Sequence, residues 1–136
     1  MALADIIIPR REIPVFDTSF TVRPLCVDDV MRALFDAQTE VTQAAKLYQA
    51  MVKDTKDDEA FNAFLAAILR DLPNLAARVI AYASDEPDKW ETVLKIPLPV
   101  QAEAFYAVVE LTFTEPDSLK KFAEKLKLLM GRMSQK

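Results

Sequence analysis

Residues 27–53 read VDDVMRALFDAQTEVTQAAKLYQAMVK, and this stretch decides the fold class. Apolar side chains recur in it every three or four residues, the spacing of one face of an α-helix. Asp28 and Asp29 fall in the expected first turn, where carboxylates suit the positive end of the helix dipole. Gln38 is the one polar residue in register. We predict a single helix over about 27–53, roughly 40 Å long, long enough for part of it to project or to pair with another subunit. The residues on its apolar face are Val27, Val30, Met31, Leu34, Val41, Ala44, Ala45, Tyr48 and Val52.

Further helices are predicted after this stretch. Residues 53–58 form a charged linker, and the helix that follows it ends at Pro73, which also suits the first position of the next helix, near 73–84. A short helical turn holds Trp90, residues 96–99 form an extended corner because of their two prolines, and another helix runs from residue 99 or 100 to about 113. The last helix is predicted from the spacing of Leu119, Phe122, Leu126, Leu129 and Met133.

Residues 6–25 differ from the rest, because they carry β-branched and aromatic clusters interrupted by Pro9, Pro14 and Pro24. Prolines are compatible with edge strands or a loose hairpin but not with central strands. Residues 16–19 would supply the turn, and without a glycine a longer loop is favoured over a tight turn. The predicted fold is therefore mainly α: a compact domain of about five helices preceded by a short N-terminal β-hairpin or extended segment. The extended segment or hairpin, 1–25, belongs to the same domain as the helical part, 26–130. Residues 131–136 are expected to form a flexible tail.

The composition of the 136 residues argues against most catalytic chemistry. There is no histidine, one cysteine and one glycine, which removes the usual general base, thiolate metal sites and glycine-rich phosphate loops. Carboxylate pairs remain, at 28–29, 57–59 and 85–88, but they fall in helix starts and linkers, where acids normally cap helices or keep loops solvated. Cys26 precedes a helix start and is expected to be inert or to cap it. We predict no enzyme activity, no cofactor and no metal.

Charge is unevenly distributed around a net value of −4. Acidic residues dominate 85–117, whereas 118–136 is basic, so the tail could lie against its acidic neighbour or offer a basic surface to a partner; we favour the first interpretation. An acidic chain with one short lysine face is a poor candidate for nucleic acid. No apolar run is long enough for a membrane span and no leader sequence is evident, so a cytoplasmic location is expected.

Several segments taken in order resemble the tail assembly chaperones, or pre-tape-measure proteins, of long-tailed bacteriophages. The resemblance covers about residues 15–130. Its most specific part is the distance between the DEP and IPLPVQAEA segments. The segments that carry it are SFTVRPL (19–25), VDDV (27–30), LPNLAARVIA (72–81), DEP (85–87), IPLPVQAEA (96–104), LTF (111–113) and LKKF (119–122).

The resemblance implies a non-enzymatic role in tail assembly. Proteins of this kind bind the tape measure protein, keep it soluble and help recruit tail tube subunits, and they are expected in the host cytoplasm and not in the mature virion. Homo-oligomers are also implied, with no nucleic acid and no membrane among the partners. The rival hypothesis is a small helical adaptor or regulatory protein-binding domain unrelated to tails.

Such binding would use helix faces with anchors three and four residues apart. The candidate contact residues are Tyr48 and Met51 on the first helix and Phe122, Leu126 and Leu129 on the last. All five suit the domain core equally well, and both interpretations stay open at this stage.

Overall fold

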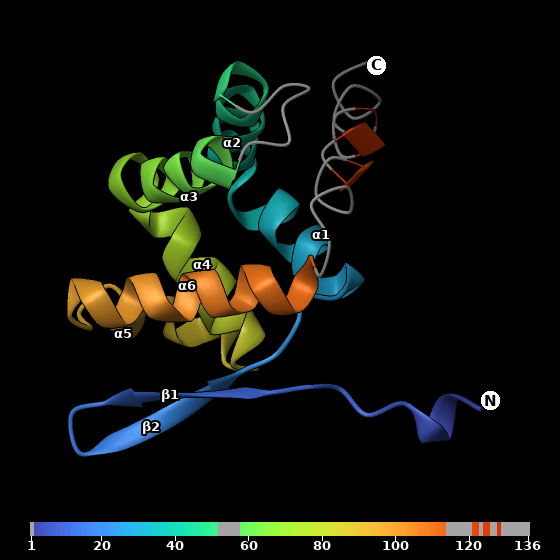
Figure 1. Cartoon of the computed structure of the whole chain (residues 1–136), viewed down its shortest axis with the longest axis vertical. Helices are drawn as coiled ribbons and strands as arrows, with labels where there is room; N and C mark the ends of the chain where they lie inside the picture. The colour runs from blue at the N-terminus through green and yellow to red at the C-terminus, as the bar shows by residue number, and fades with distance from the viewer. Residues whose placement is uncertain (1, 52–57, 114–120, 123, 126–127, 129–136) are drawn as a thin grey trace.

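The computed structural model describes residues 2–51, 58–113, 121, 122, 124, 125 and 128. A β-hairpin leads into helices that surround a central helix, α4 (Figure 1). This confirms the predicted class, a mainly helical domain preceded by a hairpin. The elements are η1 (Leu3–Asp5), β1 (Arg11–Val15), β2 (Thr18–Val22), α1 (Val27–Asp36), α2 (Gln38–Met51), α3 (Asp58–Asp71), α4 (Pro73–Ala83), η2 (Pro87–Lys89), α5 (Trp90–Val93) and α6 (Leu98–Thr112).

Helix α4 lies at the centre because its side chains are small and apolar on most sides. It packs against α1, α3, α5 and α6, and its alanines let these neighbours approach closely. Pro73 occupies the first turn, as predicted, where its missing N–H costs no helical hydrogen bond. The buried residues of α4 are Leu75, Ala76, Ala77, Ile80, Ala81, Tyr82 and Ala83.

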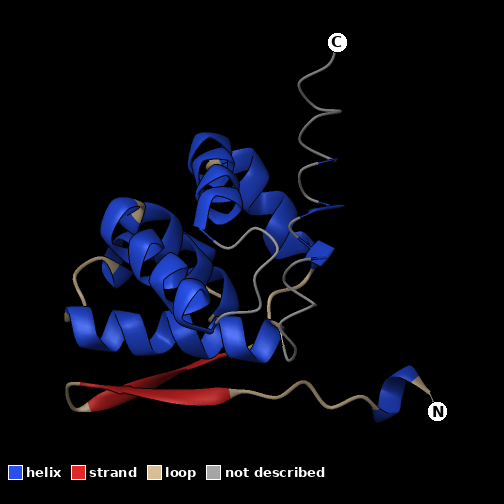
Figure 2. Ribbon diagram, turned by 45° about the horizontal axis from the view of Figure 1, so that its top comes forward, coloured by secondary structure: helices blue, strands red, loops and turns tan. Residues whose placement is uncertain are grey.

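The hairpin packs on α6 and contributes to the same core. Ile13 and Val22 are fully buried, and the two strands lie beside α6 in both views (Figures 1 and 2). Pairing is antiparallel with Val15 opposite Thr18, so the turn has only two residues, Phe16 and Asp17. The expectation of a longer loop was wrong. Phe16 adopts a φ of 52°, as the first central residue of a type II′ turn does, and thereby takes the role that glycine usually fills.

The predicted helix over 27–53 is wrong in one respect, because it is broken at Ala37. This residue has φ −142° and ψ 44°, and α2 starts afresh at Gln38. The break lets α1 pack on α4 while α2 packs on α3, so Leu34, Ala37 and Val41 all reach the core. Residues 53–57 of the predicted linker and most of the predicted last helix lie outside the described residues, although Lys121, Phe122, Glu124, Lys125 and Leu128 are helical.

Candidate partner-binding groove

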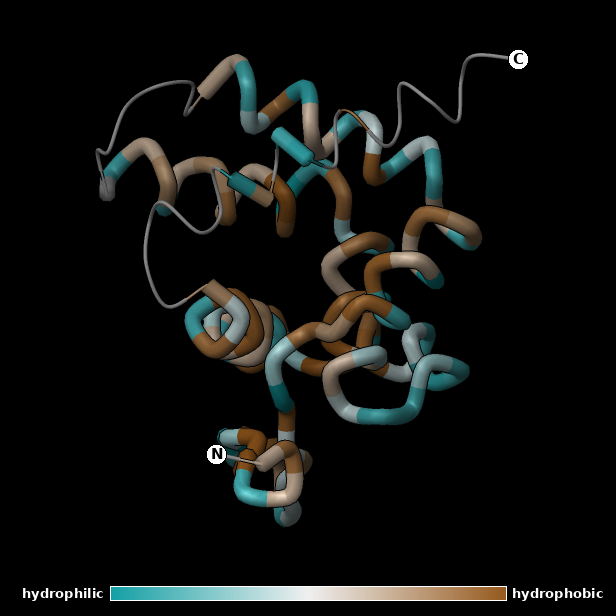
Figure 3. The backbone as a smooth tube through the Cα atoms, turned by 90° about the vertical axis from the view of Figure 1, so that its right-hand side faces the viewer, coloured by the Kyte–Doolittle hydropathy of each residue, from teal (hydrophilic) through white to brown (hydrophobic). Residues whose placement is uncertain are grey.

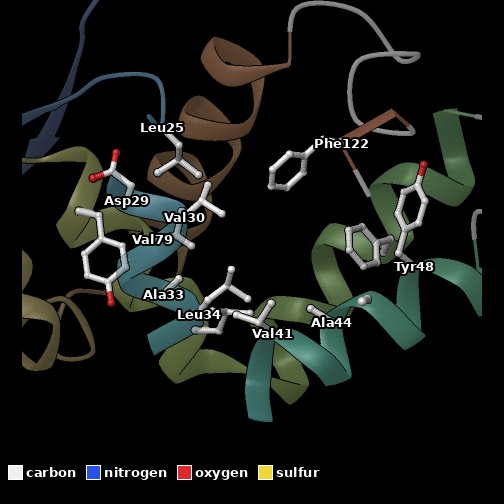
Figure 4. Close-up of a pocket in the computed structure, with 14 residues that line it drawn as sticks. Leu25, Asp29, Val30, Ala33, Leu34, Val41, Ala44, Tyr48, Val79 and Phe122 are labelled. Carbon is white, nitrogen blue, oxygen red and sulfur yellow. The ribbon is translucent and has the colours of Figure 1, made fainter. Parts of the chain in front are cut away.

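An apolar cavity of about 170 Å³ lies between α1, α2, α3 and α4. In Figure 4, Phe122 points into this space, with Leu25 and Val30 on one side and Tyr48 on the other. The lining is almost entirely aliphatic and aromatic, as in sites that accept an apolar ligand or helix face. The lining residues are Leu25, Asp29, Val30, Ala33, Leu34, Val41, Ala44, Ala45, Tyr48, Phe64, Leu75, Val79, Tyr82 and Phe122.

A second cavity, of about 570 Å³, opens beside the first. Leu25, Val30 and Phe122 line both cavities, so the two are neighbours, and we call them together the α1 groove. At its outer rim Val27 is 76% and Met31 47% exposed. The spacing of these two residues, one helical turn, places them on one stripe of α1. The remaining lining residues of the second cavity are Cys26, Thr112, Phe113 and Lys125.

The charge of Asp29, at the edge of the groove, is neutralised within the protein. Its carboxylate accepts hydrogen bonds from Arg23 Nη1 at 2.7 Å and from the Cys26 backbone N–H at 2.9 Å. Burial by itself raises the pKa of Asp29, but the hydrogen bonds from Arg23 and Cys26 outweigh it, and the pKa lies below the ordinary 3.8. Among the described residues that line the groove, Lys125 is then the one charged side chain that forms no ion pair with another described residue, so the groove favours an apolar occupant.

Arg23 joins three parts of the chain, and we call the set Arg23, Asp29 and Asp85 the Arg23 clamp. Besides Asp29 it donates from Nε to Asp85 Oδ1 at 2.9 Å and from Nη2 to the Tyr82 carbonyl at 3.0 Å. Its backbone N–H donates to the Ala83 carbonyl at 3.0 Å. The bond to Asp29 first, and then the bond to Asp85, raise the pKa of Arg23. The clamp holds the start of α1 against the end of α4 and so fixes one wall of the groove.

Two of the acidic residues considered for catalysis, Asp29 and Asp85, form ion pairs with Arg23. The hydrogen bond from Arg23 lowers the pKa of Asp85, and Arg10 adds a contact from Nη2 to Asp85 Oδ2 at 3.3 Å. Glu110 pairs with Arg11 at 3.1 Å. N-terminal arginines therefore pair with acidic residues of the stretch 85–117. The predicted contact between this stretch and the basic tail, 118–136, falls largely outside the described residues.

The described residues also contain no group of three or more His, Cys, Asp or Glu side chains placed to hold a metal. Within the same part of the chain, no helix is long and apolar enough to cross a membrane.

Of the predicted contact residues, Tyr48 and Phe122 lie in the groove. Tyr48 is 7% exposed and packs edge-to-face on Phe64 with ring centroids 5.4 Å apart; burial raises its pKa. Phe122 is half-buried, and its ring lies tilted against that of Phe113 with the centroids 5.5 Å apart. Met51 is half-buried against the core and lines neither cavity. Leu126 and Leu129 lie outside the described residues.

One part of the groove was not predicted from the sequence, namely the part formed by Leu25, Ala33 and Val79. The available signal was the width of the apolar stripe on α1. Leu34 faces the core at 2% exposure, while Val30 and Met31 extend the same stripe toward solvent. One neighbouring helix cannot cover an apolar stripe of this width, which indicates that a second partner surface contacts α1.

The fold and the groove define a class: small helical proteins whose candidate site is an apolar groove between helices, a geometry that suits an amphipathic helix. The comparisons identify the family. The family model described as "Pre-tape measure protein" matches residues 1–136, and the chain belongs to that family. Membership supports a role in phage tail assembly and points to a structural, not an enzymatic, protein. No curated protein and no solved structure matches the chain.

Proposed function

We propose that this protein is a tail assembly chaperone that binds an apolar helix face of the tape measure protein in the α1 groove. Binding there keeps the tape measure protein soluble until the tail tube forms around it. The observation that carries the proposal is the groove itself: an open, apolar channel of helix side chains, with its one buried carboxylate neutralised, on a chain of the pre-tape-measure family.

The shape of the groove supports a helix as the occupant. Its walls are helices α1, α2 and α4, and its exposed rim residues Val27 and Met31 lie one turn apart, so they match anchors three and four residues apart on an incoming helix. Methionine also adapts to varied partner surfaces. The proposed mechanism needs no proton transfer and no cofactor, because burial of apolar surface supplies the driving force.

Three wider elements complete the proposal. The protein self-associates, recruits tail tube subunits to the bound tape measure protein, and works in the host cytoplasm without entering the mature virion. Nucleic acid and membranes are not among its partners. Pull-down of the tail tube protein by the purified chain, with and without bound tape measure protein, tests recruitment; equal recovery of tube protein on a bare resin would contradict it.

Co-expression with the tape measure protein of the same phage tests the groove. Ala33 lines the groove on α1, so Ala33→Trp fills it, whereas Ala66 on α3 is exposed and lines neither cavity. We expect the parent chain and Ala66→Trp to bring the tape measure protein into the soluble fraction. Ala33→Trp should yield about tenfold less soluble tape measure protein, as a loss of roughly 1.4 kcal/mol of binding free energy would give.

Circular dichroism of the purified variants checks that each is folded. If Ala33→Trp fails to fold, Phe122→Asp places a charge at the half-buried mouth of the groove and serves as the second variant. A folded groove variant that solubilises the tape measure protein as well as the parent would refute the proposal.

A further inference from the structure

The N-terminal arm, residues 2–10, leaves the body of the protein with its apolar side chains exposed. Ile6, Ile7 and Ile8 are 58%, 88% and 57% exposed, and Leu3 is 86% exposed. Every residue of the arm is exposed, and Figure 3 shows apolar chain near the N-terminus outside the helical body. Three consecutive β-branched residues in an extended segment favour strand pairing, and such a patch usually marks an interaction site.

Beyond η1, the main chain of the arm also lacks a partner strand in the part of the chain that the structure describes. The Ile6 N–H bonds to the Leu3 carbonyl at the end of η1, but Ile7 and Ile8 form no backbone hydrogen bond with another described residue. Arg10 and Arg11 fasten the base of the arm to its own body through Asp85 and Glu110. Residues 6–9, between η1 and β1, are therefore an anchored segment that pairs with no strand among the described residues.

Within the described part of the chain, the edge of strand β2 away from β1 is unpaired and can accept such a strand. In a two-residue hairpin the residues that flank the turn, Val15 and Thr18, exchange hydrogen bonds. From Thr18 onward every second residue of β2 bonds to β1, so the N–H and C=O groups of the residues between, Ser19 and Thr21, point away from β1. The side chains of both residues are exposed. The corresponding edge of β1 is incomplete because Pro14 lacks an N–H. Of the two edges, β2 is the one that can pair fully.

The arm cannot reach the β2 edge of its own chain. It continues directly from β1, which pairs with the opposite side of β2, and Pro9 and Arg10 alone would have to carry it back across both strands. The acceptor must therefore be a second molecule. Neither residues 6–9 nor Thr18–Val22 carry a charge, so the pairing brings no like charges together.

We propose that the arm of one copy adds as an antiparallel strand to the β2 edge of a second copy. With Ile7 opposite Thr21, Ile6 and Ile8 lie beside Val22 and Phe20, the residues of β2 that face the core. Because the donor and acceptor surfaces differ, each copy can give one arm and receive another, and the assembly grows head-to-tail into a ring or a chain. This inference rests on the self-association proposed above and assigns the surface that produces it.

Two variants of the full chain separate the donor from the acceptor. Ile7→Asp puts a charge on the arm and leaves β2 intact, whereas Thr21→Pro removes the outward N–H of β2 and leaves the arm intact. In size-exclusion chromatography with light scattering, we expect the parent to elute as an oligomer and each variant alone as a monomer. An equimolar mixture of the two should form a dimer, because it contains one working arm and one working edge.

The mixture gives the decisive result, since two merely misfolded variants would not restore each other. If Thr21→Pro unfolds the hairpin, Thr21→Lys blunts the edge without removing the N–H. A mixture that stays monomeric, or an Ile7→Asp variant as oligomeric as the parent, overturns the strand exchange alone. A monomeric parent overturns self-association as well. Co-expression with the tape measure protein reads out the α1 groove separately, because neither substitution touches it.

Discussion

Replacing Arg23 with glutamine leaves the Asp29 carboxylate buried without its ion-pair partner. The side chain of Asp29 is only 7% exposed and that of Arg23 13%, so water cannot replace the lost bond. Removing one partner of a buried pair costs about 3–5 kcal/mol, a large part of the roughly 5–15 kcal/mol that stabilises a typical domain. We expect Arg23→Gln to lower the free energy of unfolding by that amount.

Urea unfolding followed by far-UV circular dichroism at neutral pH measures the effect as a lower midpoint with an unchanged slope. Arg70→Gln is the matched control, because Arg70 pairs with Asp71 in solvent, and it should leave the midpoint unchanged. The double variant Arg23→Gln/Asp29→Asn should recover at least about 1 kcal/mol, since it no longer buries an unpaired charge. If Arg23→Gln shifts the midpoint no further than Arg70→Gln does, the Arg23 clamp does not hold the fold as described.

Three further predictions concern pH, the turn and the core. The pKa of Asp29 is lowered in the folded state. The stability that Asp29 contributes is therefore present above pH about 4, its pKa in the unfolded chain, and is lost as the pH falls through its folded pKa. Urea midpoints should drop more steeply below pH about 4 in the parent than in Asp29→Asn. Phe16→Gly should raise the free energy of unfolding by up to about 1 kcal/mol, seen as a higher melting temperature, because Phe16 is 82% exposed and holds a positive φ. An equal gain from Asp17→Gly would show that the φ of Phe16 is not the cause. Leu34→Ala should cost about 2–5 kcal/mol by urea unfolding, whereas Phe35→Ala, at a side chain 91% exposed, should be nearly neutral; similar losses for both would contradict the orientation of α1.

Periodicity and prolines predicted most of the helices because these signals are local. Pro73 separates α3 from α4 as expected. Pro97 precedes α6, but the helix begins at Leu98, so Leu98 and Pro99 belong to its first turn and not to the predicted extended corner. The break at Ala37 gave no such signal. Alanine is the best helix former, and the chain bends there because α1 and α2 pack on different helices, which only the assembled core determines.

The Arg23 clamp could not be predicted for a related reason. Asp85 follows Arg23 by 62 positions, and nothing in a single sequence says which of many acids an arginine will meet. The predicted contact residues were chosen from helix faces, which placed Tyr48 and Phe122 in the groove. The same reasoning could not supply the opposite wall, since Leu25 and Val79 come from segments whose approach depends on the clamp.

The position of Cys26 has a practical consequence. It is the only cysteine in the chain, its side chain is exposed, and it lines the larger cavity of the α1 groove. A maleimide fluorophore would thus attach at a single point on the rim without any substitution. Arrival of an apolar helix would displace water around the dye and shift its emission, so the natural thiol provides an optical readout of groove occupancy and of binding rates.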